Sequence, residues 1–393
     1  MQPRVACGYA APMNAPLEKA RALAPMIAAA GDSIEAARRL TPDVVDALHA
    51  AGLYRLLLPR DLDGAELDLA EFSLVIEAIA QADGSTAWCV CQGNGCAQSA
   101  GFLAADAARE VFGGKRAVLA WGPGSAQVVE LPHGWRISGK WGFASGCRQA
   151  SWLGCYVPVP DEAGKPRFAP DGTPMLRTFV FPAASAEISD VWQVIGLRGT
   201  ASDAYTVSDL VVPARLSFLR NAPQRTDYPL YRFTINSVYM AGFPGVAMGI
   251  ARAMLTDFIA LAGAKTPRLI KSTLRDDALI QAQVAQCEAR LRAARALLQQ
   301  TLEESWRAAA AGRLTVEHRL ANRLSSTYAI HQAREVADIV FHAAGATAIY
   351  ESHPLERRMR DIITVSQHLQ ARLQHYETVG QALLGLEPDL SVT

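Results

Sequence analysis

The chain has 393 residues, half of them hydrophobic and 19% charged, and is therefore too long and too apolar for a disordered protein. It predicts a globular protein of two or three packed units. Basic and acidic residues both number 38, so no net charge favours nucleic acid or an anionic membrane surface as a partner. Seven cysteines without dense spacing fit free thiols in a reducing compartment, and we expect a cytoplasmic protein.

Neither an export signal nor a membrane span is expected. The first 30 residues hold no continuous apolar core, because prolines and charged residues interrupt them. The uncharged stretch from Phe233 to Ala251 is long enough to be considered as a spanning helix. Polar residues, three glycines and Pro244 dilute its hydrophobicity, so we expect a buried helix of a bundle instead.

The first part of the chain, to about residue 112, has a helical pattern, and we expect four or five helices there. Thr41 is placed to be an N-cap, Pro42 suits the first helical position, and Gly52 is a typical C-terminal stop. A second apolar face, Phe72 to Ile79, repeats with a helical period and breaks at residues 83–86, which cap another helix.

After residue 116 the pattern changes to short β-branched and aromatic runs separated by turn residues. This pattern predicts a small antiparallel β domain. A hairpin turn is expected at residues 132–134 and a polar loop at 160–173. The predicted strands are 118–121, 126–131, 135–138, 152–159, 177–181 and 205–212.

Helical periodicity returns after the polar segment that ends near Tyr228 and persists to the end of the chain. Apolar residues from Ile280 to Leu302 step by four and three, so one long helix offers a seam to a bundle or to a neighbouring subunit. The predicted fold class is α+β, mainly α. Its expected parts are a helical domain at 1–115, a β domain at 116–222 and a helical bundle at 223–393.

The usual nucleotide, hydrolase and metalloprotease motifs are missing from the sequence. Cys89, Cys91 and Cys96 lack a second paired group of ligands, so we expect buried small side chains and no metal. His368 and His375 are two helical turns apart, too far for shared metal ligation by neighbouring turns. Taken alone, each histidine is more typical of a core or surface position than of catalysis.

Two segments of the predicted β domain, 139–146 and 196–202, combine small residues with hydroxyl groups. Their backbone amides and hydroxyls would be able to approach a planar polar ring closely. From the residues alone, a ligand site and a pair of ordinary glycine-rich turns are equally supported.

The order of these parts resembles the acyl-CoA dehydrogenase fold, and the details resemble its flavin-dependent monooxygenase branch. That branch includes the oxygenase components of p-hydroxyphenylacetate and secosteroid hydroxylases and dibenzothiophene monooxygenase. The resemblance rests on segments spread over most of the chain, namely 53–60, 83–88, 141–146, 191–202 and 353–368.

The resemblance implies an oxygenase component that uses reduced FMN, or FADH2, and O2 to hydroxylate a phenolic or indole-type substrate through a flavin hydroperoxide. A separate NAD(P)H-dependent reductase would supply the reduced flavin. Acyl-CoA dehydrogenases use a glutamate about two turns after an Arg-Asp pair. Here Arg360 and Asp361 are followed by His368 with no carboxylate in that window, and the histidine is implied to face substrate as a base.

Family positions imply that Ser145 bonds near flavin N5, and that Trp141, Phe143 and Ala144 wall the flavin ring. After Gly199, the hydroxyls of Thr200 and Ser202 would contact the ring or its substituent chain.

Lys265 and Arg268 resemble a basic element that reaches a neighbouring subunit's flavin phosphate, and a solvated helix-end cluster is the alternative. Asn94 and Trp121 are candidates for the substrate pocket by position. The long apolar seam, with the packing of relatives about two-fold axes, predicts a homotetramer.

Three other functions stay open. They are N- or S-oxygenation within the same branch, an acyl-CoA dehydrogenase activity, which the missing glutamate disfavours, and a non-catalytic flavin-binding or scaffold protein.

Overall fold

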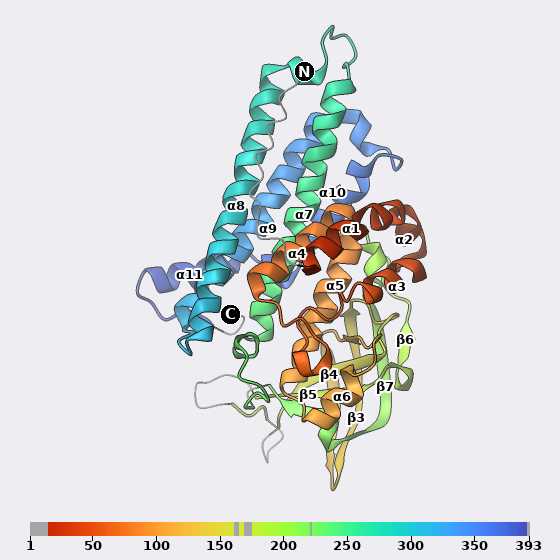
Figure 1. Cartoon of the computed structure of the whole chain (residues 1–393), viewed down its shortest axis with the longest axis vertical. Helices are drawn as coiled ribbons and strands as arrows, with labels where there is room; N and C mark the ends of the chain where they lie inside the picture. The colour runs from red at the N-terminus through yellow and green to blue at the C-terminus, as the bar shows by residue number, and fades with distance from the viewer. Residues whose placement is uncertain (1–14, 161–164, 169–174, 221, 391–393) are drawn as a thin grey trace.

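In the computed structural model, residues 15–160, 165–168, 175–220 and 222–390 are described. An N-terminal group of helices and a β domain lie beside a bundle of long helices (Figure 1). The predicted α+β class, mainly α, is confirmed. The first 14 residues, most of the loop predicted at 160–173 and Cys7 lie outside the described residues.

The N-terminal helices pack around α4 and α5. Asp68 caps α4 by accepting a hydrogen bond from the backbone N–H of Glu71, and Asp83 caps α5 through Thr86. Thr41 is the N-cap of α3, with Pro42 at the first turn, as predicted. The helices are α1 Ala15–Ala29, α2 Gly31–Ala37, α3 Pro42–Ala50, α4 Leu69–Ala82, α5 Gly84–Ala97 and α6 Ala105–Phe112.

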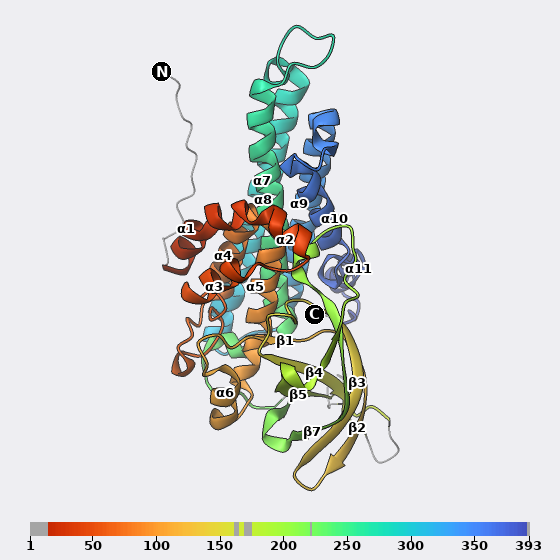
Figure 2. The ribbon, with the colours of Figure 1, turned by 90° about the vertical axis from the view of Figure 1, so that its right-hand side faces the viewer.

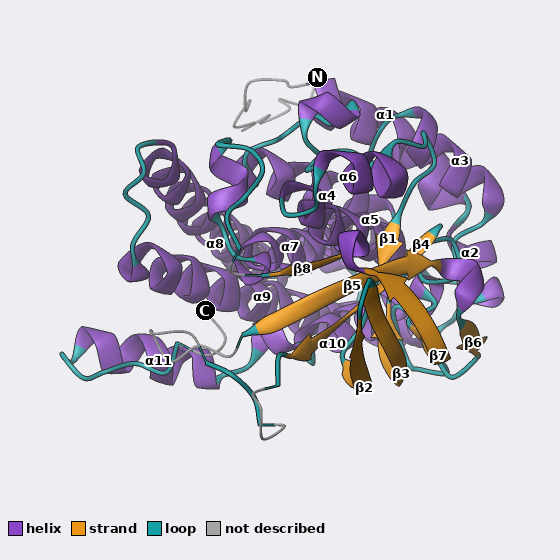
Figure 3. Cartoon of the chain, turned by 90° about the horizontal axis from the view of Figure 1, so that it is seen from below, coloured by secondary structure: helices purple, strands orange, loops and turns teal. Residues whose placement is uncertain are grey.

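The β domain consists of two sheets, ordered β1-β4-β5-β8 and β2-β3-β7-β6, which fan out beneath the helices (Figure 3). All neighbouring strands are antiparallel except β1 and β4, which run parallel. The two short strands β6 and β8 were not predicted. The strands are β1 Leu119–Ala120, β2 Gly124–Leu131, β3 Gly134–Ala144, β4 Trp152–Pro158, β5 Leu176–Pro182, β6 Glu187–Ser189, β7 Asp203–Pro213 and β8 Ser217–Leu219.

Three long helices build the C-terminal bundle, and α7 is its central member. The arm formed by α7 and α8 extends beyond the N-terminal helices (Figure 2). The bundle contains α7 Ile235–Ala264, α8 Ala278–Ala310 and α9 Val316–Ala344, followed by α10 Pro354–Ser366, the short 3-10 helix η9 Leu369–Ala371 and α11 Gln374–Leu383.

Helix α7 contains the apolar stretch that was considered as a membrane span. Among the described residues it is the one helix long and apolar enough to cross a membrane, and 67% of its most apolar window is buried in this chain. It packs against α4, α5, α9 and α10. This arrangement agrees with the buried helix expected from its polar and glycine residues.

The apolar seam of α8 is also buried within this chain, from Ile280 through Leu291 to Leu302. It packs on α9 and, less extensively, on α7 and α4. Of the two partners predicted for this seam, the bundle is the one found, because its side chains pack within the same chain. The seam therefore gives no support to the predicted homotetramer.

Candidate active site

Three hydroxyl groups from the two glycine-containing segments form a buried chain. The Ser145 and Ser202 oxygens lie 2.7 Å apart, and Ser202 lies 2.7 Å from Thr200. Trp88 of α5 donates its indole N–H to Ser145 at 2.9 Å, and Thr200 donates to the carbonyl of Leu197 at 2.8 Å. These hydrogen bonds join residues that are 57 positions apart in the sequence. Ser145, Thr200 and Ser202, which were predicted to share one site, do lie together.

The ends of this hydroxyl chain fix its direction. The indole of Trp88 can only donate and the carbonyl of Leu197 can only accept, so each hydroxyl donates toward Leu197. Ser145 accepts from Trp88 and gives its own proton to Ser202. Its oxygen keeps a second lone pair, so the hydrogen-bonding position left on Ser145 is an acceptor.

The loop after β6, residues 190–202, requires an unusual backbone. Leu197 and Ala201 both have positive φ angles, 51° and 43°. Between them η4, Arg198–Thr200, packs on α2 and α5, and a Cβ on Gly199 would collide with the side chain of Ile34. Gly199 thus has a steric role, since it lets the loop approach both helices.

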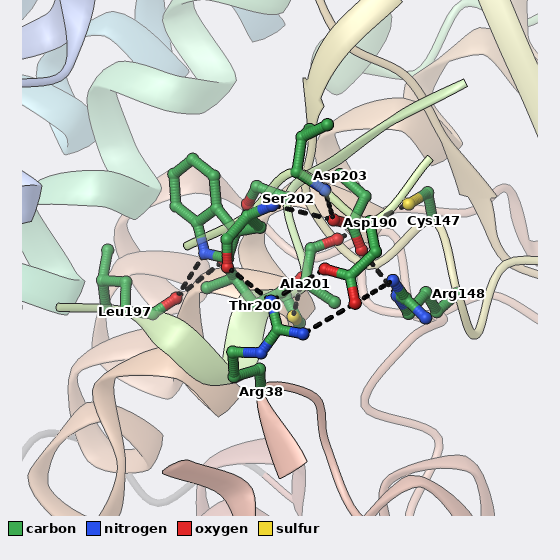
Figure 4. A network of polar contacts seen from close by, with 12 residues as sticks. Arg38, Cys147, Arg148, Asp190, Leu197, Thr200, Ala201, Ser202 and Asp203 are labelled. Carbon is green, nitrogen blue, oxygen red and sulfur yellow. Dashed lines mark hydrogen bonds and ion pairs between the residues drawn. The ribbon is translucent and has the colours of Figure 1, made fainter. Parts of the chain in front are cut away.

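Charged groups hold the first part of this loop (Figure 4). The buried carboxylate of Asp203 accepts from the backbone N–H groups of residues 191 and 192, at 2.9 and 3.0 Å, and from Arg148 at 2.5 Å. Asp190 receives two hydrogen bonds from Arg38, which follows α2, at 2.8 and 2.6 Å. The loop is therefore fixed to both the β domain and the N-terminal helices.

Helix α10 holds the second part of the loop. Asp361 accepts from the backbone N–H of Leu197 at 2.5 Å, and Arg360 donates to the carbonyl of Ile195 at 2.6 Å. Burial, and then the nearby carboxylate of Asp83, raises the pKa of Asp361 to about 7. We call residues 190–203 the bridging segment, since all three parts of the chain anchor it.

His368 lies in a largely aromatic environment where α10 meets η9. Its ring contacts Phe243 and Trp88 edge to face, with ring centroids 4.5 and 5.1 Å apart. The Nδ1 atom accepts a hydrogen bond from the backbone N–H of Gln370 at 3.3 Å. Through Trp88, His368 is one side chain away from the hydroxyl chain at Ser145.

Burial, and then the positive charges of Arg323 and Arg372, lowers the pKa of His368 to about 4. The imidazole is therefore neutral at pH 7. Because Nδ1 accepts from Gln370, the neutral ring carries its proton on Nε2. His368 presents a hydrogen-bond donor at its remaining nitrogen.

An aromatic row continues from His368 along α7. Phe243 stacks on Trp88 with centroids 4.0 Å apart, and Tyr239, one turn earlier, stacks on Phe243 at 5.1 Å. The Tyr239 hydroxyl lies 4.0 Å from the sulfur of Cys96. None of these aromatic residues was assigned a role from the sequence, although an indole N–H in an apolar helix such as α5 usually finds an acceptor.

The three residues expected to wall the flavin ring occupy different environments. Trp141 is buried in the β domain, stacked on Tyr205 at 5.3 Å, and its indole N–H has no partner among the described residues. Ala144 is buried, whereas Phe143 is 68% exposed and contacts Trp192 of the bridging segment. Of the three, Phe143 is the one that offers its ring to a ligand.

Asn94 is fully buried within α5. Its oxygen accepts from the backbone N–H groups of Leu56 and Leu57, and its nitrogen donates to the carbonyls of Leu53 and Val90. These four bonds use both hydrogens and both lone pairs of the amide. Asn94 therefore fixes residues 53–57 and has no free position for substrate, contrary to the role expected from its position.

Lys265 and Arg268 belong to the loop between α7 and α8, at the top of Figure 1, and are not brought to the hydroxyl chain of their own subunit. Lys265 donates to the carbonyl of Ala344 at 2.6 Å and to Thr347 at 2.8 Å. Arg268 is exposed. Lys265 thus caps the end of α9, and Arg268 is the more accessible of the two cations.

The described residues contain no group of three or more histidine, cysteine or acidic side chains that could hold a metal ion. A surface hollow of about 810 Å³ lies where α7 and α9 begin, lined by Arg232, Thr234, Gly312, Leu314, Thr315, Val316, Glu317 and Arg319. None of these residues belongs to the hydroxyl chain or to the aromatic row. The chemistry of the chain therefore points to the interior site around His368 and Ser145.

Comparison with known proteins matches two family models, "Acyl-CoA dehydrogenase, N-terminal domain" over residues 18–110 and "Acyl-CoA dehydrogenase, C-terminal domain" over residues 241–373. An indole-3-acetate monooxygenase from Pseudomonas putida is 33% identical over 357 residues, covering 89% of each chain. The chain belongs to the flavin-dependent monooxygenase branch of the acyl-CoA dehydrogenase family. This monooxygenase is accordingly an oxidoreductase.

A second relative supports the division of labour within this branch. It is the oxygenase component of an FADH(2)-dependent resorcinol hydroxylase from a Rhizobium strain, 26% identical over 90% of each chain. The structure of a 3-HSA hydroxylase from Rhodococcus has the same fold, with a TM-score of 0.89 over 97% of this chain and 99% of that one, at 24% identity. The monooxygenase thus uses reduced flavin, and a separate protein supplies it.

Proposed function

We propose that this monooxygenase hydroxylates a small aromatic substrate, phenolic or indole-type, at the site between His368 and Ser145. The observation that supports this most is His368 itself. No Asp or Glu occurs between Asp361 and Glu377, so the segment that would carry an acyl-CoA dehydrogenase's glutamate offers a neutral imidazole set against two aromatic rings. An electron-rich ring suits this environment better than an acyl thioester.

The residues at the bridging segment fit a reduced flavin. The exposed ring of Phe143, together with exposed Val191 and Ile195, provides an apolar face beside the hydroxyl chain. Ser145 offers an acceptor, and reduced flavin carries a hydrogen on N5 whereas oxidised flavin does not. We therefore assign N5 to Ser145 and the ring to the face near Phe143, with Thr200 and Ser202 acting through Ser145.

When bound, reduced flavin supplies the activation of O2 and the delivery of one oxygen atom. The chain's own residues exclude water and position protons. The aromatic row formed by Trp88, Phe243 and Tyr239 separates the site from solvent on the α7 side. Trp88 also donates a hydrogen bond to Ser145. One side chain therefore both borders the substrate site and positions the hydrogen-bond partner of the cofactor.

His368 was predicted to begin as a base. Its geometry favours the role of a hydrogen-bond donor instead, because Nδ1 already accepts from the backbone N–H of Gln370 and Nε2 carries the proton. With a pKa of about 4, the ring also has little tendency to take up a proton at pH 7. We propose that His368 keeps its Nε2 proton and donates a hydrogen bond from Nε2 to an oxygen of the substrate, which orients the ring for oxygen transfer.

The proposed function also implies a reductase partner and a subunit assembly. A separate NAD(P)H-dependent flavin reductase supplies reduced FMN or FADH2, and the oxygenase works as a cytoplasmic homotetramer. The exposed Leu269 and Ile270, beside Arg268 on the projecting loop, support a subunit contact there in place of the α8 seam. In such a contact Arg268 would reach the flavin phosphate of the neighbouring subunit.

The function is tested by supplying the protein with photoreduced FMN or FAD and 18O2, with a panel of phenols, indoles, amines and thioethers. We expect a product heavier by one 18O atom from phenols or indoles only. Label found only in amines or thioethers would favour the N- or S-oxygenating alternative. If an acyl-CoA reduces oxidised flavin on the protein without any other reductant, the protein would instead be a dehydrogenase.

A further inference from the structure

We propose that Arg220 binds a carboxylate of the substrate, so that the substrate class is an aromatic ring carrying a short acidic side chain. This inference rests on the proposed function and names the substrate chemistry at the same site. Sequence reasoning did not single out Arg220, which directly follows the short strand β8.

The guanidinium of Arg220 is held in place by uncharged groups. It lies over the ring of Tyr156, 4.1 Å from its centroid, and 5.5 Å from that of Trp121. Its Nε donates to the hydroxyl of Thr178 at 3.1 Å. Its Nη2 atom is buried and has no hydrogen-bond acceptor among the residues that the structure describes. The side chain is thus oriented by its neighbours while one of its strongest donor groups stays unused.

Within the described residues, no carboxylate pairs with Arg220. Two other partly buried arginines show the usual arrangement, since Arg225 pairs with Asp61 and Arg295 with Glu77. Around Arg220 the titratable neighbours are Tyr156, Tyr239 and Cys96, none of which is a carboxylate. A partly buried cation that no described carboxylate pairs with loses hydration without compensation, and an anionic ligand would relieve that cost.

Arg220 stands at the far end of the aromatic row that begins at His368. Tyr239 lies between them, close to Cys96 and stacked on Phe243, which contacts His368. Tyr239 and Arg220 each keep part of their surface accessible. An aromatic ring placed along this row, with its reactive position toward His368, would direct a side chain on its opposite edge toward Arg220.

The anion that suits such a site has two possible sources, a carboxylate on the substrate or the phosphate of the flavin. We favour the substrate, because Arg220 contacts Trp121 and neighbours the row that leads to His368, whereas the hydroxyl chain assigned to the flavin lies beyond Trp88. A binding experiment distinguishes the two sources.

The test compares indole-3-acetate with indole-3-acetamide, and 4-hydroxyphenylacetate with its amide, each pair differing only in charge. Binding to the flavin-free protein is measured by quenching of tryptophan fluorescence, and KM by product formation. We expect the wild type to favour each acid by about 10-fold to 100-fold, the range for one charge-assisted hydrogen-bonded pair. Arg220→Met should remove this preference, and Arg220→Lys should keep part of it.

Arg177→Met is the matched control. Arg177 also stacks on a tryptophan, 4.8 Å from the ring of Trp135, and lies in the same sheet on β5, but it has no contact with the aromatic row. This variant should keep the full preference for the acids.

Equal binding of acid and amide by the wild type would overturn the proposal without any variant. Weaker binding of reduced FMN by Arg220→Met, with an unchanged preference for the acids, would assign Arg220 to the flavin phosphate and also overturn it. If the wild type prefers the acids in binding yet oxygenates no aromatic compound, the proposed function fails while the assignment of Arg220 holds.

Discussion

Replacing Ser145 with alanine tests the directed hydroxyl chain. The substitution removes the acceptor for the indole N–H of Trp88, which is 7% exposed, and the donor to Ser202. Leaving a buried N–H unsatisfied costs about 1–3 kcal/mol, so the free energy of unfolding should fall by that amount. If Ser145 also holds flavin N5, loss of that one bond should shift the ratio of product to released hydrogen peroxide by several-fold to about 100-fold.

The assay follows O2 uptake, product and hydrogen peroxide together, with photoreduced FMN and a saturating aromatic substrate. Thr200→Val is the graded control. It cuts the chain at its far end, where the carbonyl of Leu197 still receives a hydrogen bond from the indole of Trp192 at 3.0 Å. We expect Ser145→Ala to release much more peroxide than Thr200→Val. An unchanged product-to-peroxide ratio in Ser145→Ala would refute the reasoning, since the chain would then be structural only.

Four further outcomes are expected. His368→Ala should slow product formation by several-fold to about 100-fold, the range for one lost hydrogen bond, while His368→Gln, which keeps an N–H donor, should lose less; equal losses would return the base role to His368. Because the pKa of His368 is lowered to about 4, the wild-type rate should stay level from pH 6 to 9, and an inflection near pH 6.5 assigned to this ring by NMR would contradict the donor role. Asp361 has a raised pKa of about 7, so it stays protonated in the folded chain while the unfolded chain ionises above about pH 4, and stability is lost as pH rises through this window. Asp361→Asn should therefore raise the unfolding free energy at pH 8 by up to about 4 kcal/mol and leave it unchanged at pH 4; a gain of equal size at both pH values would disprove this linkage. Gly199→Ala should destabilise the chain by about 1–3 kcal/mol through its collision with Ile34, as thermal unfolding would show, and a wild-type melting temperature would contradict the steric role.

Local patterns were sufficient to predict the order of the three parts and most element positions. Thr41 and Pro42 mark a helix start by capping geometry that depends on adjacent residues only. The α8 seam was predicted as an apolar face, but periodicity does not say what covers it. Its partner, α9, lies within the same chain, and this removed the seam as a basis for assembly.

The residues predicted to wall the flavin site show what such patterns cannot predict, namely the direction in which each side chain points. Trp141 and Phe143 are two residues apart in β3, a spacing that places side chains on one face of a regular strand. A register irregularity between Trp141 and Ala144, with φ of 54° at Phe143, sends one ring into the core and the other outward. Neither feature has a signature in the residues themselves, so the prediction treated the two aromatic residues alike.

Asn94 was misjudged, and Arg220 was overlooked, for a related reason. A polar side chain in an apolar setting signals that something must satisfy it, and the sequence does not identify the partner. For Asn94 the partner is the backbone of residues 53–57, whereas for Arg220 no described group of the chain supplies an anion.

The threefold anchoring of the bridging segment limits how this enzyme can be redesigned. Arg38, Arg148 and Asp361 each tie residues 190–203 to a different part of the chain, so a substitution there disturbs domain docking as well as the cofactor's surroundings. Phe243 and Tyr239 make no such connection, because their described ring contacts are with Trp88, with His368 and with each other. Libraries that seek new substrate preferences should therefore vary these two positions and the surroundings of Arg220, and leave the bridging segment and the rest of α7, which packs on four other helices, intact.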